Sequence, residues 1–254
     1  MTDIGLSVGF LLVLGGVFAG YVNAVAGGGS ALTIPLFMYC GLDASLANGT
    51  NRVSVGIQAL SANLSFKKAG VKTDKAVLWP IVWVIIGATL GALVAVLLPA
   101  DFLNIVFSII FLVLAAVIAR GPALLNPPKS TANRHPWSTA ISYTLIGAYG
   151  GAFQAGVGVP LLLALVQLGG LDVIKGNAFK ALIIFVYTAI VLLIFNGVGQ
   201  VVWLPGLLVG MGGVFGSVIG ASHVISKGSN LVRWVVIIIL SISGLRGLWT
   251  GLIH

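Results

Sequence analysis

The chain has 254 residues, of which 59% are hydrophobic and only 7% are charged, with a formal net charge of +8. A mean hydropathy of +1.14 excludes a water-soluble globular domain and indicates an integral membrane protein. The basic residues lie mostly in short loops, where they set membrane orientation, so the positive charge predicts a lipid bilayer as partner and no nucleic acid.

Ten apolar segments follow one another along the chain, five on each side of a polar stretch. They cover residues 4–25, 31–41, 53–66, 76–98, 102–119, 139–155, 157–169, 181–196, 201–225 and 231–249. The runs are continuous rather than alternating, so they predict α-helices and exclude a β-barrel. The first run lacks a basic leader, so no cleaved signal peptide is expected. We therefore predict an all-α polytopic protein of the inner or plasma membrane of a bacterium or archaeon, crossing the bilayer several times.

The two groups of segments form a repeat. Residues 1–119 are the first transmembrane repeat, 120–137 a proline-rich polar linker loop, and 138–254 the second repeat. One offset of 129 residues relates four pairs: Gly41-Leu42-Asp43 with Gly170-Leu171-Asp172, Asn48 with Asn177, Gly70 with Gly199, and Gly87-x-x-x-Gly91-Ala92 with Gly216-x-x-x-Gly220-Ala221. Duplicated apolar chains are typical of transporters whose site lies between the halves. The alternative is that both halves merely kept the same packing glycines.

The number of crossings decides whether the second repeat is inverted. Five crossings per half invert it, and with the Lys67–Lys75 loop in the cytoplasm they place 11 of the 13 Lys and Arg residues on or near that side. If the two short segments are re-entrant, with four crossings per half, Lys227 and Arg233 move outside. We therefore predict inverted repeats, with both termini outside.

The second segment of each half is short and follows a glycine-rich stretch. In the first half this stretch is Gly27-Gly28-Gly29-Ser30, and in the second it is Gly156-Val157-Gly158. Both short segments carry a proline near the start, so we predict half-length helices broken at a glycine loop. Backbone N–H groups at such a helix N-terminus bind anions. The alternative is that the glycines allow close helix packing.

Polar residues follow the short segment in each half. They are Asn48, Thr50, Asn51 and Arg52 in the first half, and Asn177 and Lys180 in the second. A cation thus recurs within one residue of the same place, which predicts two cations that converge on an anionic substrate. The alternative is that both long side chains snorkel to the membrane interface.

Several other polar residues interrupt or flank the apolar runs. Asn23 and Gln154, 131 residues apart, fall where a helix breaks and either bind a ligand or satisfy the loop backbone. Asp43 and Asp172 precede helical runs and are predicted N-caps. Gln58, Asn63, Gln167 and Tyr187 are interpreted as interhelical hydrogen-bonding residues.

The remaining inventory excludes other chemistry. The chain has no glutamate, and none of its five aspartates lies within an apolar run, which disfavours a carboxylate-coupled antiporter. A lone Cys40 excludes an internal disulfide, and three scattered histidines without acidic partners disfavour an enzyme. We expect no catalytic residue, metal or cofactor. The Gly-x-x-x-Gly faces pack either the two halves or two protomers, the second case giving a homodimer.

At these residues the chain resembles the sulfite-exporter (TauE/SafE) family of membrane permeases. The first half carries Gly20-x-x-Asn23-x-x-x-Gly27-Gly28-Gly29-Ser30, then Pro35, Gly41-Leu42 and Ala47-x-Gly49-Thr50-Asn51-Arg52. The second half repeats the pattern as Gly151-x-x-x-x-Gly156-x-Gly158-x-Pro160 with Lys180, although its loop is shorter and Asn177-Ala178-Phe179 replaces the small polar run. The resemblance implies a carrier, often an exporter, of sulfite, sulfonates or sulfoacetate.

These observations predict a transporter that works by alternating access around a central anion site. The predicted site comprises Asn23, Gly27, Gly28, Gly29, Ser30, Asn48, Thr50, Asn51, Arg52, Gln154, Asn177 and Lys180. Arg52 and Lys180 would supply charge, and the glycine amides and polar side chains would donate hydrogen bonds. An anion-selective channel and a non-transporting membrane scaffold subunit are the alternatives.

Overall fold

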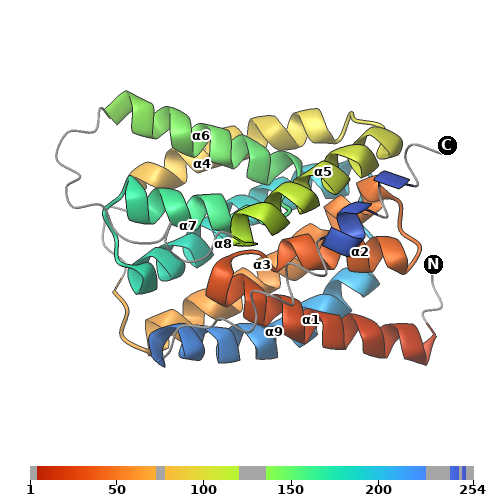
Figure 1. Ribbon diagram of the computed structural model, residues 1–254, viewed down its shortest axis with the longest axis horizontal. Helices are drawn as coiled ribbons and strands as arrows, with labels where there is room; N and C mark the ends of the chain where they lie inside the picture. The colour runs from red at the N-terminus through yellow and green to blue at the C-terminus, as the bar shows by residue number, and fades with distance from the viewer. Residues whose placement is uncertain (1–4, 73–77, 120–135, 227–240, 246–247, 250–254) are drawn as a thin grey trace.

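The computed structural model describes residues 5–72, 78–119, 136–226, 241–245 and 248–249, and within these ranges the regular structure is helical (Figure 1). The labelled helices are α1 (Leu6–Ala26), α2 (Ser30–Tyr39), α3 (Ala44–Lys68), α4 (Leu78–Ala95), α5 (Ala100–Ala119), α6 (Pro136–Ala152), α7 (Gly158–Gln167), α8 (Val173–Gly197) and α9 (Trp203–Ser226). The predicted all-α fold is confirmed. Most of the predicted linker and of the last apolar run lies outside the described residues.

Helices α3 and α8 correspond closely. Each has 25 residues, and their first and last residues are 129 positions apart. The Asp43 carboxylate accepts a hydrogen bond from the Leu46 N–H at 2.8 Å, and Asp172 accepts one from the Lys175 N–H at 2.9 Å. The N-cap prediction is confirmed for both. Both helices begin several residues before the apolar runs expected from the sequence, because the capped first turns are polar.

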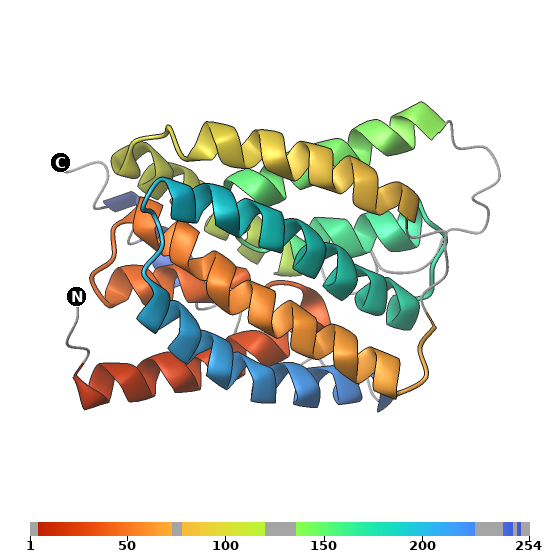
Figure 2. The ribbon, with the colours of Figure 1, turned by 180° about the vertical axis from the view of Figure 1, so that it is seen from behind.

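Helix α3 lies inside the bundle. By length and apolar composition, four described helices qualify as membrane spans, namely α1, α4, α8 and α9. Helix α3 is long enough but carries too many polar residues, and it packs against α1, α2, α5, α8 and α9 (Figure 2). Protein therefore covers its polar residues, which lipid could not solvate.

The two short helices return toward the end of the bundle from which they came. Figures 1 and 2 both show α1 entering the bundle and α2 turning back, and α6 and α7 do the same from the opposite end. Each short helix has 10 residues, which span about 15 Å, half of a hydrocarbon core. Of the two alternatives that the sequence left open, the structure therefore favours re-entrant segments for α2 and α7. Helices α1 and α2 together return the chain to the end of the bundle at which it started. The first half therefore passes along the bundle three times, in α3, α4 and α5, and this odd number is what inversion of the second half requires.

The small-residue faces are occupied within the chain. A Cβ added to Gly87 or Gly91 of α4 would overlap the backbone of α6, and one added to Gly216 or Gly220 of α9 would overlap or crowd α1. Helix α1 packs along α9, and α4 packs along α6. These glycines therefore join helices of the first half to helices of the second.

Candidate anion-binding site

The glycine turns of the two halves lie in direct contact in the interior. A Cβ at Gly27 would overlap the backbone of Gly158, and a Cβ at Gly158 would overlap that of Gly27. Gly27 also has φ +76°, a left-handed conformation that glycine adopts without strain. Helix α2 begins just after the first turn and α7 begins at the second. The N-termini of α2 and α7, which carry a partial positive charge, are therefore both buried.

Lys180 binds the end of α1. Its Nζ donates to the backbone oxygen of Asn23 at 2.9 Å, to that of Ala24 at 3.4 Å and to the Asn177 Oδ1 at 2.6 Å. The lysine is 2% exposed. The last carbonyl groups of a helix lack donors within the helix, and here only the Asn23 oxygen also accepts from a backbone N–H, that of Gly27 at 3.0 Å. Lys180, supplied by α8, therefore completes the C-terminal cap of α1.

Arg52 binds the end of α6 in a similar way. Its Nη1 donates to the Gly150 oxygen at 2.6 Å, and its Nη2 donates to the oxygens of Gly151 and Ala152 at 2.9 and 3.2 Å. Nη2 also donates to the Asn48 Oδ1 at 3.0 Å, and the guanidinium lies 4.7 Å from the centre of the Phe195 ring. The planar fork of arginine suits this cluster of carbonyl groups.

The two cations thus have equivalent roles in opposite halves. Arg52 in the first half caps a helix of the second half, and Lys180 in the second half caps a helix of the first. Each is held by an asparagine, Asn48 or Asn177, at positions 129 apart. Both cations are buried, so the snorkelling alternative is wrong. In this structure their hydrogen bonds go to protein oxygens at two different helix ends.

A polar network joins the two glycine turns. Ser30 Oγ donates to the Gln154 backbone oxygen at 2.8 Å and accepts from the Gly156 N–H at 2.9 Å. The Gln154 side chain accepts from Asn51 Nδ2 at 3.4 Å and donates to Thr188 Oγ1 at 3.0 Å. Gln154 has φ 57°, uncommon for a residue other than glycine. The network supports this backbone conformation and brings Ser30, Asn51 and Gln154 together.

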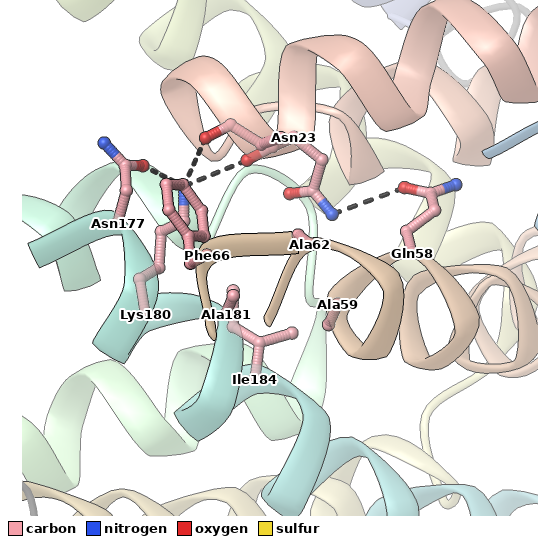
Figure 3. Close-up of a pocket in the computed structure, with 10 residues that line it drawn as sticks. Asn23, Gln58, Ala59, Ala62, Phe66, Asn177, Lys180, Ala181 and Ile184 are labelled. Carbon is pink, nitrogen blue, oxygen red and sulfur yellow. Dashed lines mark hydrogen bonds between the residues drawn. The ribbon is translucent and has the colours of Figure 1, made fainter. Parts of the chain in front are cut away.

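A narrow pocket opens beside Lys180, with room for about one water molecule (Figure 3). It is lined by Asn23, Ala24, Gln58, Ala59, Ala62, Phe66, Asn177, Lys180, Ala181 and Ile184. Asn23 Nδ2 donates to Gln58 Oε1 at 3.3 Å, whereas Gln58 Nε2 is buried without a hydrogen-bond partner. The pocket therefore combines one cation and three amide side chains with apolar walls, a composition typical of small-ligand sites.

The remaining predicted residues have other contacts. Thr50 Oγ1 accepts from the Val202 N–H at 2.9 Å, just before α9, so the structure does not bring it to the pocket. A Cβ at Gly29 would overlap the backbone at Ala19, and the Gly28 oxygen accepts from the Ala31 N–H. Gly29 thus has a packing role and Gly28 takes part in the turn before α2, in addition to any ligand role. Among the described residues no group of His, Cys, Asp or Glu could hold a metal ion.

The sequence interpretation is incomplete for two residues. Gln58 makes the predicted interhelical hydrogen bond, since its Oε1 accepts from Asn23 Nδ2, but Gln58 Nε2 and the Tyr187 hydroxyl are both buried without a partner. They are 129 positions apart, on α3 and α8. Applying the repeat offset to unlike polar residues, and not only to identical ones, would have paired them.

Comparisons with known proteins agree with this architecture. The sequence model of the family described as "Sulfite exporter TauE/SafE" matches residues 12–247. The chain is similar to a "Probable membrane transporter protein ORF9" of Sinorhizobium sp., with 30% identity over 94% of this chain and 92% of the relative. It is also similar to the "Probable membrane transporter protein YfcA" of Escherichia coli K12, with 28% identity over 94% of this chain and 90% of that protein.

A third relative, a "Probable membrane transporter protein" of Haemophilus influenzae, is 27% identical over 93% of this chain and 92% of its own length. No solved structure matches the chain. The family match covers both halves, including the glycine turns, both capped helix ends and the Lys180 pocket. The chain therefore belongs to the TauE/SafE sulfite exporter family and is a membrane transporter.

Proposed function

We propose that this transporter carries a small sulfur-containing anion, such as sulfite, a sulfonate or sulfoacetate, and exports it by alternating access. The observation that carries the proposal is the pocket beside Lys180, which lies next to the end of α1, where the helix stops at the first glycine turn. A buried cation and the nearby N-termini of α2 and α7 favour a negatively charged ligand. The family description supports sulfur as the chemical class.

The charge distribution in the interior supports an anion. Among the described residues the carboxylates are Asp43, Asp101 and Asp172, and all three are exposed. Arg52 and Lys180 are buried, and their recorded partners are neutral oxygens and a Phe195 ring. A buried cation is costly without a counter-charge. A bound oxyanion would supply this counter-charge, most readily at Lys180, whose contact with Ala24 is long at 3.4 Å.

The courses of the helices support inverted repeats. In Figure 2, α3 runs from left to right and α8 runs from right to left, and α1 and α6 also run in opposite directions. The packing of α1 on α9 corresponds to that of α6 on α4. In such transporters one half rocks against the other around a fixed site. We place this multi-pass protein in the inner or plasma membrane.

Ligand-dependent stability of the purified protein tests the proposal. A ligand that binds only the folded state raises the melting temperature. We expect sulfite, sulfoacetate or a related sulfur oxyanion to raise it selectively, in a panel that includes taurine, sulfate, thiosulfate, phosphate and chloride. Saturable flux with counterflow in proteoliposomes is expected for a carrier, whereas flux that does not saturate would indicate a channel. If no anion stabilises or crosses, the proposal is wrong.

A matched pair of variants tests the place of the site. Lys180→Gln and Lys175→Gln each remove one lysine charge from α8, but Lys175 is 58% exposed and pairs with Asp172. We expect only Lys180→Gln to abolish ligand-induced stabilisation. Melting without ligand identifies a variant that merely fails to fold. Equal ligand responses in both folded variants would exclude Lys180 from the site.

A further inference from the structure

The Lys180 pocket has a counterpart built from corresponding residues. The 129-residue offset maps Gln58 onto Tyr187, Phe66 onto Phe195, Asn177 onto Asn48, and Ala181 onto Arg52. These counterparts are adjacent in the structure, since Arg52 lies over the Phe195 ring and bonds Asn48. The second set therefore combines a cation, an amide, an aromatic ring and a phenol, whereas the pocket combines a cation, three amides and an aromatic ring.

Two hydrogen-bond donors in this second set have no acceptor. Arg52 Nε and the Tyr187 hydroxyl are buried atoms without a hydrogen-bond partner, and both residues are 0% exposed. The next residue of α8, Thr188, accepts through its Oγ1 from Gln154 Nε2 at 3.0 Å. An unsatisfied buried donor costs about 1–3 kcal/mol, so such groups are rare and call for an explanation.

The cap geometry explains which Arg52 donor is left over. Nη1 and Nη2 bind the carbonyl groups of Gly150, Gly151 and Ala152, so the end of α6 stays capped without Nε. Arg52 and Tyr187 both lie beside Gly150, because Arg52 Nη1 donates to the Gly150 oxygen at 2.6 Å and a Cβ added at Gly150 would come within 3.1 Å of the Tyr187 hydroxyl. A cationic N–H and a phenolic O–H that both lack an acceptor are the kinds of donor that bind the oxygen atoms of a small oxyanion.

We propose that Arg52 and Tyr187 form a second anion site, the counterpart of the Lys180 pocket, which the substrate occupies in another step of the transport cycle. This inference rests on the proposed function, because its ligand is the transported oxyanion. It separates the two cations into two consecutive sites instead of one shared site. Tyr187 then contributes to translocation and not to the first binding event at Lys180.

Tyr187→Phe tests the inference, because it removes the unpartnered hydroxyl and keeps the ring. The matched control is Tyr143→Phe, which removes another buried phenol, one that donates to the Ala164 oxygen at 3.5 Å. Counterflow of a labelled sulfur oxyanion is measured in proteoliposomes, and ligand-induced stabilisation in detergent. A hydrogen bond to a charged group contributes about 1.5–3 kcal/mol, so we expect Tyr187→Phe to slow counterflow about tenfold or more.

Ligand-induced stabilisation by the same anion should change by less than about twofold in affinity in Tyr187→Phe, and Tyr143→Phe should match the wild type in both assays. Wild-type counterflow in Tyr187→Phe would overturn the second site while leaving the proposed function intact. A parallel loss of affinity and counterflow would also overturn it, since the hydroxyl would then serve the first site. A wild-type protein that moves no oxyanion would instead refute the proposed function itself.

Discussion

The C-terminal ends of α1 and α6 both lie in the interior, and different cations cap them. The Lys180 ammonium group has three N–H donors, and its three hydrogen bonds use all of them. Arg52 brings a five-donor fork, caps three carbonyl groups with two nitrogens, and leaves Nε without a partner. A helix that ends inside a membrane protein needs its carbonyl groups satisfied, and the opposite half supplies the donor in both cases. The comparison shows that a repeated cation can have a structural role before any role in binding.

Removing either cap gives the largest expected effect. Arg52→Met leaves the buried oxygens of Gly150 and Gly151 without a donor, while the Ala152 oxygen keeps its bond from Asn48 Nδ2, and should lower stability by about 3–5 kcal/mol. Lys180→Met leaves only the Ala24 oxygen without a donor, because the Asn23 oxygen still accepts from the Gly27 N–H, and should cost less, about 1–3 kcal/mol. The apparent melting temperature in detergent measures both. The exposed Lys175→Met serves as control, with a change within about 0.5 kcal/mol. Equal melting of all three variants would refute the capping role.

The contact between the glycine turns should be the next most sensitive feature. Gly158→Ala forces a methyl group into the backbone of Gly27, and should cost about 1–3 kcal/mol or more. Gly70→Ala is the control, because Gly70 has φ +82° but open space around its Cα. It should show only the conformational cost, about 1 kcal/mol. A smaller loss for Gly158→Ala than for Gly70→Ala would contradict close contact of the turns.

A carboxylate placed beside each cation compares the two proposed sites without truncating a side chain. In Asn177→Asp the new charge lies at the 2.6 Å contact with Lys180 Nζ, and in Asn48→Asp it lies at the 3.0 Å contact with Arg52. The internal counter-charge should compete with the anion, so we expect Asn177→Asp to weaken anion binding about tenfold, or 1.4 kcal/mol. Asn48→Asp should slow counterflow with a smaller effect on affinity. Titration calorimetry and counterflow separate the two results.

The N-caps should show the smallest effects, and equal ones. Asp43→Ala and Asp172→Ala each remove one acceptor for a first-turn N–H, at a cost of about 1 kcal/mol or less. Asp172 also pairs with Lys175 at 3.8 Å, but that pair is exposed and adds little. Replacement by Asn preserves the cap and is the control. Melting losses that differ by more than about 0.5 kcal/mol would show that α3 and α8 begin differently.

The local features of the fold could be predicted from the sequence. Long apolar runs predicted membrane helices, glycine next to a short run predicted α2 and α7, and an aspartate before a helical segment predicted each N-cap. Each of these inferences depends on residues within one or two helical turns of one another. Whether α2 and α7 cross or are re-entrant stayed open, because hydropathy records apolar length and not the direction in which a helix turns.

The site was predicted less completely, because its contacts are far apart in sequence. Arg52 and Gly150 are 98 positions apart, and Lys180 and Asn23 are 157 positions apart. The sequence identified both cations as unusual but assigned them to a ligand, since backbone carbonyl groups carry no sequence signal. It assigned Gln58 and Tyr187 to interhelical hydrogen bonding, and their unpartnered donors are visible only after the surrounding helices are in place.

By itself the sequence determined that this protein lies in a lipid bilayer, that its fold is all-α, that its two halves share a repeated pattern, and that each half contains a short helix after a glycine turn. The reason is that lipid cannot satisfy backbone hydrogen bonds, so an apolar chain must satisfy them locally within helices. Only the tertiary structure decided where the helices end in the interior, which cation caps which end, and which donors are left for a ligand. Those partners are chosen by packing between the two halves, where glycine contacts such as Gly27 with Gly158 set how closely the backbones approach.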